Sequence, residues 1–588
     1  MNLEDLGLIG NCQYSALVNS NGAVVWCCLP RFDSEPIFAS LLDEENGGDF
    51  RIGAPDGKPG QQAYIENTNI LQTTFKTSEG TFRVTDFAPR YTVGDRLYRP
   101  TELIRMVEPL EGSPRVSVRC MPRLGWSKRE PSVEFGPQCF DYGGFGSLLR
   151  LTTDAPVSYL DGEPFRLSER RYFVLSFGPP SAEPFLAHCE QSLAETIRYW
   201  TRWVKHCNVP AEYQREVIRS ALVLKLHCFE DTGAIVAAMT TSIPESAGSG
   251  RTWDYRYCWL RDAYYTLDAF RLLGHFEERE SFTRYLLNIA GGAEDLALAP
   301  LYRIDGKSDL EEHIMSDWPG FGGNGPVRVG NAASTQAQND IFGEVVLALS
   351  PVFLDDRYSD ERSPATLKLL EQLTRKAIAV AGTPDAGIWE MRSAATPRTF
   401  SSLMCWAAAN RMGRVAARTG SAEESTFRQA AARIQNEMET RCWNDSLGSF
   451  VGSYGGSDLD ASLLQMATLS FLPVNDPRLA STIDALTQRL SRNGWLLRYH
   501  VDDGFGEPSV AFIICTFWLA EALARIGRLG ESRAVLRRAH AAMSPLGLLG
   551  EDYEATTLRM WGNFPQAYSH VGLIHAAFAA AAPWSSVM

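Results

Sequence analysis

The sequence predicts a multidomain protein of α and β structure, with an N-terminal antiparallel β-sandwich followed by an (α/α)6 toroid. Three observations predict this fold class. Hydrophobic residues alternate with period two up to about residue 177, whereas the strongly periodic segments after about residue 190 have helical spacing. The helical segments are joined by alternating short and long connections, which is typical of helical hairpins. We therefore expect a β-sandwich domain at residues 1–190, a helical linker at 191–209 and an α/α barrel at 210–588.

Several short strands with intervening turns predict the sandwich. Residues 16–18 and 23–27 flank the turn Ser20-Asn21-Gly22, and residues 69–77 and 81–87 flank Ser78-Glu79-Gly80. We expect further strands at 103–107, 115–120, 148–152, 157–160 and 172–177. These strands carry no catalytic constellation, although the loop at 31–33 could reach a neighbouring site.

The second half of the chain predicts twelve helices after an aromatic-rich helix at 193–206, which suits the docking of two domains. The twelve segments are 211–229, 260–274, 277–291, 333–352, 364–382, 400–419, 422–440, 457–470, 475–492, 508–527, 530–543 and 565–581. In consecutive antiparallel helices, all odd-to-even connections lie at one end. A closed ring of six hairpins would place these loops around a central pocket. An open α-solenoid is the alternative, but we find no consensus of fixed period between hairpins.

Composition restricts the classes of partner. The 588 residues are 45% hydrophobic and 21% charged, which is enough to bury a large core. The formal net charge of −14 argues against a nucleic-acid partner, because binding to phosphates needs clustered Lys and Arg. No apolar run approaches 18 residues, and the start MNLEDLGLIG has acidic residues where a signal peptide needs basic ones. We expect a cytoplasmic protein that does not bind a membrane.

The pattern of cysteine, histidine and glycine residues gives no indication of a metal or cofactor. The twelve cysteines are scattered without a CxxC pair, and the nine histidines include no HExxH. Glycine-rich phosphate loops of the Walker and dinucleotide types are also missing from the sequence. We therefore expect free thiols, no metal site and no cofactor.

The stretch RTWDYRYCWLRDAYYTLD at 251–268 is the strongest candidate for a binding site. It places several Trp and Tyr residues beside Arg and Asp residues and then continues into a helix. Aromatic faces next to bidentate hydrogen-bonding groups suit a pyranose ring, which has apolar faces and a rim of hydroxyls. The alternative is a buried aromatic segment with a structural Arg–Asp pair.

Two loops on the predicted rim carry candidate catalytic carboxyls. Glu390 follows Trp389, and an adjacent indole would desolvate the carboxyl and raise its pKa, as a general acid requires. The loop at 544–564 offers Glu551, Asp552 and Glu554, which could instead form a solvated acidic turn. A carboxyl from each loop could supply the pair needed for inverting glycoside hydrolysis, about 6.5–9.5 Å apart. His313 and His570 are interpreted as structural.

Several motifs together resemble glycoside hydrolase family 15, which contains glucoamylases, glucodextranases and bacterial trehalases. They are WDYRYCWLRDA (253–263), GIWEMR (387–392), CTFWLAEAL (515–523), GLLGEDYE (547–554) and GNFPQAYSHVGLI (562–574). The N-terminal segment GLIGNCQYSALVNSNGAVVWCCLPRFDS (7–34) is similar to the start of the β-sandwich of prokaryotic members. The resemblance therefore covers almost the whole chain.

The resemblance implies specific roles for nine residues. Glu390 would be the general acid and Glu551 the general base, so the resemblance selects Glu551 over Glu554. The implied substrate-binding residues are Tyr255, Trp259, Arg261, Asp262, Trp389, Arg392 and Arg498. Gly387 and Ser402 depart from residues found in fungal and some bacterial members respectively, which affects the expected contacts beyond the first sugar.

These observations lead to the hypothesis of an inverting exo-acting α-glucosidase that releases a terminal glucose as the β-anomer. A small oligosaccharide such as trehalose, isomaltose or a malto-oligosaccharide is the expected substrate. One alternative is an inverting α-glucoside phosphorylase, in which phosphate replaces water and no base is required. Another is a catalytically inactive sugar-binding protein. The sequence does not predict an oligomeric state.

Overall fold

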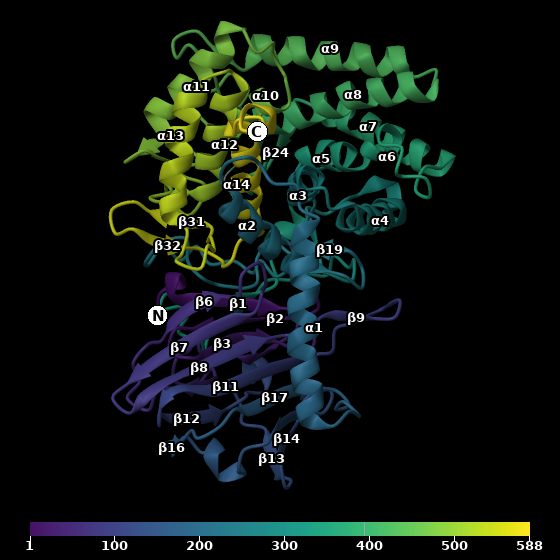
Figure 1. The fold of residues 1–588 in the computed structure, drawn as a ribbon. Helices are drawn as coiled ribbons and strands as arrows, with labels where there is room; N and C mark the ends of the chain where they lie inside the picture. The colour runs from purple at the N-terminus through teal and green to yellow at the C-terminus, as the bar shows by residue number, and fades with distance from the viewer. Residues whose placement is uncertain (393) are drawn as a thin grey trace.

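The computed structural model describes residues 1–392 and 394–588. An N-terminal part built from antiparallel sheets lies against a helical C-terminal part, and the long helix α1 (Phe185–Lys205) runs alongside both (Figure 1). This arrangement confirms the predicted order of a β part followed by an α part.

Two sheets form the N-terminal part, and every strand pairing in their described residues is antiparallel. The first has the order β1-β2-β3-β5-β12-β16, with β4 paired to β3: β1 (Leu6–Gly10), β2 (Ser15–Asn19), β3 (Ala23–Cys28), β4 (Pro36–Phe38), β5 (Phe50–Gly53), β12 (Arg115–Cys120), β16 (Phe165–Arg166). The second has the order β13-β14-β15-β17-β11-β8-β7-β6: β6 (Gln61–Tyr64), β7 (Leu71–Thr77), β8 (Gly80–Phe87), β11 (Glu102–Gly112), β13 (Ser132–Phe135), β14 (Cys139–Gly143), β15 (Leu149–Thr153), β17 (Arg171–Phe177). A separate hairpin joins β9 (Tyr91–Val93) and β10 (Arg96–Tyr98).

The two sheets are joined through a buried core and through the buried guanidinium of Arg105. Arg105 of β11 pairs with Asp86 of β8 at 2.8 Å, and both side chains are fully buried. The same guanidinium donates to the backbone oxygens of Phe50 and Gly22, which belong to the first sheet and its hairpin turn. One guanidinium therefore satisfies main-chain acceptors across the interface between the sheets.

One predicted strand is wrong and the helix between the two parts is longer than predicted. Residues Val157–Leu160 form a 3₁₀ turn, because the amide of Tyr159 bonds back to the carbonyl of Pro156 at 2.9 Å. Helix α1 begins at Phe185, directly after Pro184, rather than at residue 193. The Trp203 indole of α1 donates to Glu278 at 2.9 Å, which connects this helix to the helical part.

Helical structure occurs in each of the twelve segments predicted to be helical. The principal helices are α2 (Gln214–His227), α3 (Leu260–Leu273), α4 (Phe276–Gly292), α5 (Asp340–Leu349), α7 (Pro364–Val380), α8 (Thr399–Thr419), α9 (Glu424–Arg441), α11 (Pro477–Leu490), α12 (Ile513–Arg525), α13 (Leu529–Ala539) and α14 (Ala567–Ala580). Two segments differ from the prediction. The fourth begins with the 3₁₀ turn η5 (Ala332–Thr335) and ends with α6 (Pro351–Leu354), and the eighth contains only η6 (Ala461–Leu464) and α10 (Gln465–Thr468).

The contacts between the even-numbered predicted helices lead from each helix to the next and from the last helix back to the first. Helix α3 packs against α5, α5 against α8, α8 against η6, η6 against α12, α12 against α14 and α14 against α3. The other long helices pack against members of this set. The loops that enter α3, α5, α8, α12 and α14 therefore come from neighbouring positions. Among the described residues, we find no helix with the length and apolar character needed to cross a membrane.

Candidate active site

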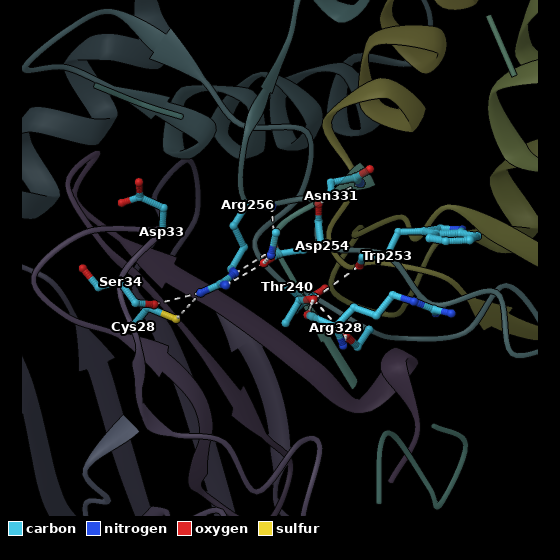
Figure 2. A network of polar contacts seen from close by, with 12 residues as sticks. Cys28, Asp33, Ser34, Thr240, Trp253, Asp254, Arg256, Arg328 and Asn331 are labelled. Atoms are coloured by element: carbon cyan, nitrogen blue, oxygen red, sulfur yellow. Dashed lines mark hydrogen bonds and ion pairs between the residues drawn. The ribbon is translucent and has the colours of Figure 1, made fainter. Parts of the chain in front are cut away.

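The segment before α3 is extended, so its side chains point alternately to two sides. Trp253 and Tyr255 are partly exposed, whereas Asp254 and Arg256 are buried. Arg256 bonds both oxygens of Asp254 at 2.9 and 2.7 Å and donates to the Ser34 carbonyl at 2.8 Å (Figure 2). The Asp254–Arg256 pair thus connects the segment to the N-terminal part, while the two aromatic residues face a cavity. The loop at 31–34 contacts the back of the site rather than the cavity.

The cavity consists of two adjoining compartments. Four residues line both and form the waist between them: Tyr255, Trp389, Glu390 and Arg498. The inner compartment is completed by Ala237, Trp259, Arg261, Asp262, Ile388, Phe512, Gln566 and Tyr568. The outer compartment is completed by Glu245, Arg251, Trp253, Asn331, Ala333, Gln336, Arg392, Asp503 and Phe505. The structure thus brings all seven predicted substrate-binding residues and Glu390 to one cavity.

Glu390 lies at the waist in a constrained loop. Its backbone φ is 57°, a left-handed conformation that is costly for a residue other than glycine. The indole of Trp259 donates to Glu390 Oε1 at 2.7 Å, and Gln336 donates to the Glu390 carbonyl at 3.2 Å. The loop and its neighbours therefore fix the carboxyl at the junction of the two compartments.

The indole bonded to Glu390 is not that of the adjacent residue in sequence. Trp389 instead donates to both oxygens of Asp460, each at 2.9 Å, and packs edge-to-face on Phe512 with ring centroids 5.7 Å apart. Trp389 therefore forms a wall of both compartments, and Trp259 supplies the hydrogen bond to the candidate acid.

Glu551 lies directly behind Tyr255. The Tyr255 hydroxyl donates to Glu551 Oε1 at 2.7 Å, whereas Glu551 Oε2 is buried without a hydrogen-bond partner in the described part of the chain. Burial and the nearby Glu245 carboxylate raise the pKa of Glu551 to about 8, against the opposing effects of the Tyr255 hydroxyl and Arg498. Glu554, in contrast, is partly exposed and accepts from Thr557 at 2.7 Å. Asp552 is as buried as Glu551, but Glu551 accepts a hydrogen bond from Tyr255, which lines both compartments. The contact with Tyr255 therefore favours Glu551 among the carboxyls of this loop.

Two neighbouring aromatic residues link the candidate catalytic carboxyls. The rings of Tyr255 and Trp259 are 5.2 Å apart in an edge-to-face arrangement. Tyr255 binds Glu551 and Trp259 binds Glu390, so residues 161 positions apart in the chain meet at the same extended segment. Glu390 itself lines the waist, whereas Glu551 lines neither compartment and is connected to the waist through the Tyr255 hydroxyl.

Arg261 and Asp262 provide polar groups in the inner compartment. Arg261 donates to the Ile388 carbonyl at 2.6 Å and lies 3.4 Å from Asp262 Oδ1. Arg261 Nε and Asp262 Oδ1 are buried without a hydrogen-bond partner within the described ranges 1–392 and 394–588. Burial raises the pKa of Asp262 to about 6, although Arg261 opposes this shift. Such unsatisfied groups beside an aromatic wall suit sugar hydroxyls.

The outer compartment contains residues that the sequence analysis did not assign. Glu245 forms a close ion pair with Arg498 and accepts from the Trp253 indole at 3.1 Å. Arg392 packs against both Phe505 and Trp253, and its guanidinium is 5.0 and 4.8 Å from their ring centroids. Glu245 lies in the loop between the first two predicted helices, so the rule that odd-to-even loops form the rim places it there but does not distinguish it from other polar residues of the rim.

His313 and His570, the two histidines considered in the sequence analysis, do not line the cavity. His313 is exposed on β22 (His313–Met315). His570 is fully buried, where its Nδ1 lies 2.9 Å from the Ser220 hydroxyl and its Nε2 accepts from the Leu549 amide. The position of His570 agrees with a structural role, whereas His313 is exposed and its role stays a prediction.

Comparison with known proteins identifies the family. The model for glycosyl hydrolases family 15 matches residues 211–578, and the model described as trehalase-like, N-terminal, matches residues 1–138. The chain belongs to glycosyl hydrolase family 15. The protein is therefore a glycoside hydrolase, and the resemblance seen in the sequence motifs is confirmed. As a family 15 member, it carries the two-compartment cavity in the segment matched by the family model, which contains all of the lining residues described above.

Family 15 relatives are similar over nearly their full length. A trehalase from Mycolicibacterium smegmatis is 32% identical, with 98% of this chain and 90% of that protein covered. A trehalase from Thermoplasma volcanium is also 32% identical, with 97% and 92% covered. A bacterial glucoamylase solved in complex with acarbose has a TM-score of 0.70 at 15% identity, with 98% of this chain and 94% of that chain covered. This structural likeness establishes a shared fold.

Proposed function

We propose that the protein is an inverting, exo-acting α-glucosidase that hydrolyses trehalose. The observation that carries this proposal is the meeting of two compartments at Glu390. A disaccharide would place one ring in each compartment and its glycosidic oxygen at the waist. The similarity to full-length relatives named trehalase supports trehalose as that disaccharide.

In the proposed reaction, Glu390 donates a proton to the glycosidic oxygen and Glu551 activates water. Glu390 lines both compartments, where the leaving oxygen would lie. Tyr255 occupies one oxygen of Glu551, so the unpartnered Oε2 is the oxygen available to accept a proton from water. Trp259, Arg261 and Asp262 would hold the glucose whose anomeric carbon is attacked. Inversion requires this water between the base and the sugar.

The helical packing supports exo action. We assign residues 210–588 to an (α/α)6 toroid, because the contacts of its even-numbered helices return from α14 to α3. Trp259, Phe512 and Tyr568 of the inner compartment are each less than 10% exposed, so its inner end is closed. A sugar chain would then enter only by its terminal unit. The sheets end with β17 at Phe177, and the linker helix α1 begins at Phe185 rather than at the expected residue 191. The two complete the proposed domain organisation.

The anomers formed from trehalose test the mechanism. Both glucose units of trehalose are α-linked, so inversion at one anomeric carbon yields one β-glucose and one α-glucose. Proton NMR in the first minutes should therefore detect equal amounts of the two anomers, before mutarotation. An initial product that contains only α-glucose would exclude inversion. An absence of glucose release from trehalose and also from maltose and isomaltose would indicate an inactive sugar-binding protein.

An inverting phosphorylase is the second candidate, because three arginines line the outer compartment. Arg251 pairs with Asp503, Arg392 with Glu312 and Arg498 with Glu245. Each positive charge is therefore opposed by a carboxylate, which disfavours the binding of a phosphate dianion. With phosphate added, hydrolysis should yield glucose only, whereas a phosphorylase would form glucose 1-phosphate.

A further inference from the structure

A buried ion pair joins two loops at the outer compartment. Arg251 Nη1 and Nη2 donate to the two oxygens of Asp503, each at 2.7 Å, and Arg251 also donates to the Gly506 carbonyl at 2.5 Å. Arg251 and Asp503 are each only 5% exposed. This bidentate pair connects the loop that precedes α3 to the loop that precedes α12. Such fork-to-fork pairs fix orientation as well as distance.

Asp503 also fixes two other parts of the wall. The Tyr499 hydroxyl donates to its carboxylate at 2.5 Å, and the Arg392 amide donates to its backbone carbonyl at 3.0 Å. Three loops therefore meet at one residue. Because Arg392 belongs to the loop that carries Glu390, the wall is connected to the waist of the cavity.

The tip of the loop that precedes α12 has a fixed conformation. Gly504 and Gly506 have φ values of 104° and 90°, which favour glycine, and both amides donate to Asp502 at 2.8 and 2.9 Å. Phe505 between them packs edge-to-face on Trp253 with ring centroids 5.2 Å apart. Both aromatic residues line the outer compartment and neither lines the inner one.

We propose that Arg251 and Asp503 are specificity-determining residues that restrict the outer compartment to one sugar unit. A third sugar would have to pass between the two loops that this ion pair holds together. This limit on the chain length of the substrate, called the chain-length limit below, rests on the proposed hydrolysis at Glu390. It narrows the substrate class of that site to disaccharides rather than longer α-gluco-oligosaccharides.

The test compares trehalose with the trisaccharide that carries one additional α-1,4-linked glucose on one of its two units. Release of maltose identifies cleavage of the same bond as in trehalose, with the same ring in the inner compartment. The ratio of the kcat/KM values for that cleavage then measures only the outer compartment. Wild-type protein should prefer trehalose at least tenfold. The substitutions Asp503→Asn and Arg251→Lys should each raise the relative rate on the trisaccharide about tenfold, because they weaken one bidentate pair.

The control is Ser509→Ala, which removes the exposed 3.5 Å contact of Ser509 with Ser246 between the same two loops and should leave the ratio unchanged. A wild-type ratio near one, or unchanged ratios in folded variants with wild-type melting temperatures, would refute the chain-length limit. If wild-type protein hydrolyses neither sugar, the failure lies in trehalose as the substrate. The ratio of kcat/KM for maltose to kcat/KM for maltotriose then tests the chain-length limit independently of trehalose.

Discussion

At the scale of single residues, the site separates two carboxyls by their surroundings. Glu390 faces both compartments, whereas Glu551 is 1% exposed and lies behind Tyr255. Trp259 and Tyr255 each donate a hydrogen bond to one of them, so the two carboxyls have fixed and different environments. The two carboxyls therefore differ in solvent access and in hydrogen-bond donor, and the raised pKa of Glu551 means that the candidate base must lose its proton before it can act.

The substitutions Glu390→Gln and Glu551→Gln test these roles. Each keeps the shape of the side chain but removes proton transfer, so kcat should fall about a hundredfold to ten-thousandfold with folding retained. The matched control is Glu554→Gln in the same loop, which should retain nearly full activity because Glu554 is directed towards Thr557 rather than Tyr255. Initial rates of glucose release measure the effect. A near-normal rate for either variant would remove that residue from its proposed role.

The dependence of activity on pH tests the link between Glu245 and Glu551. Burial and Glu245 raise the pKa of Glu551, and a base acts only when ionised, so kcat/KM should rise as the pH increases through that pKa. Glu245→Gln removes the negative charge that disfavours ionisation of Glu551. The substitution also leaves the positive charge of Arg498 less neutralised, and both effects lower the pKa of Glu551. The ascending limb should therefore move about one pH unit lower. An ascending limb of the kcat/KM profile that stays at the same pH or moves to higher pH would contradict this coupling between Glu245 and Glu551.

Single residues differ in how far the sequence could predict them. Glu390, Arg261 and Asp262 belong to motifs that resemble those of family 15 and follow one another along the chain in the same order. Their shared location could therefore be expected from the sequence. The ion pair between Glu245 and Arg498 joins residues 253 positions apart, and no local pattern distinguishes this glutamate from those on the surface. Its significance depends on burial and on a partner that only the folded chain brings near.

At the scale of elements, the hairpin of β31 (Asp552–Glu554) and β32 (Arg559–Trp561) positions the candidate base. Gly562 follows β32 with a φ of 73°, and a Cβ at this position would lie 2.4 Å from Glu551 Cβ. The amide of Gly562 also donates to the Pro244 carbonyl at 2.8 Å, which connects the hairpin to the loop of Glu245. No larger side chain fits without moving Glu551.

Gly562→Ala should therefore lower both activity and stability. The left-handed backbone and the contact with Glu551 should cost about 1–3 kcal/mol, and displacement of the carboxyl should reduce kcat more than KM rises. Gly530→Ala is the matched control, because a Cβ at Gly530 meets no atom within 4 Å. Thermal unfolding and steady-state rates measure the two effects. A G562A variant with wild-type kcat would show that the hairpin does not position Glu551.

Periodicity predicted most helices but not the tertiary contacts that interrupt them. The predicted helix at 457–470 forms only short turns in the structure. Asp460 caps η6 through the Ser462 amide at 2.8 Å and also accepts from the indole of Trp389, 71 residues away. The sequence contains the helical spacing, whereas the competing partner comes from another loop.

At the scale of the whole molecule, the Asp254–Arg256 pair joins the two parts of the protein. Sequence reasoning grouped these residues with the sugar-facing aromatics, because a single stretch does not reveal which face each side chain takes. In the structure, Arg256 reaches Ser34 of the sheet part, while Trp253 on the opposite face lines the outer compartment (Figure 2). The N-terminal part therefore supports the segment that carries Tyr255 and Trp259.

Arg256→Met tests this support. The substitution leaves Asp254 fully buried and unpaired, which should lower the free energy of unfolding by about 3–5 kcal/mol. The additional change Asp254→Asn removes the unpaired charge and should recover part of that loss. The control Arg271→Met breaks the Arg271–Asp268 pair on α3, which is about half exposed on the arginine side, and should cost less than about 1 kcal/mol.

Urea unfolding curves measure the free energies, and kcat/KM for trehalose reports on the geometry of Tyr255. Loss of activity in the folded Arg256→Met protein should accompany the loss of stability, because the same extended segment carries the pair on one face and the aromatic residues on the other. If stability falls but kcat/KM is unchanged, the pair holds the two parts together without positioning the site. If neither changes, the buried pair does not support the catalytic segment.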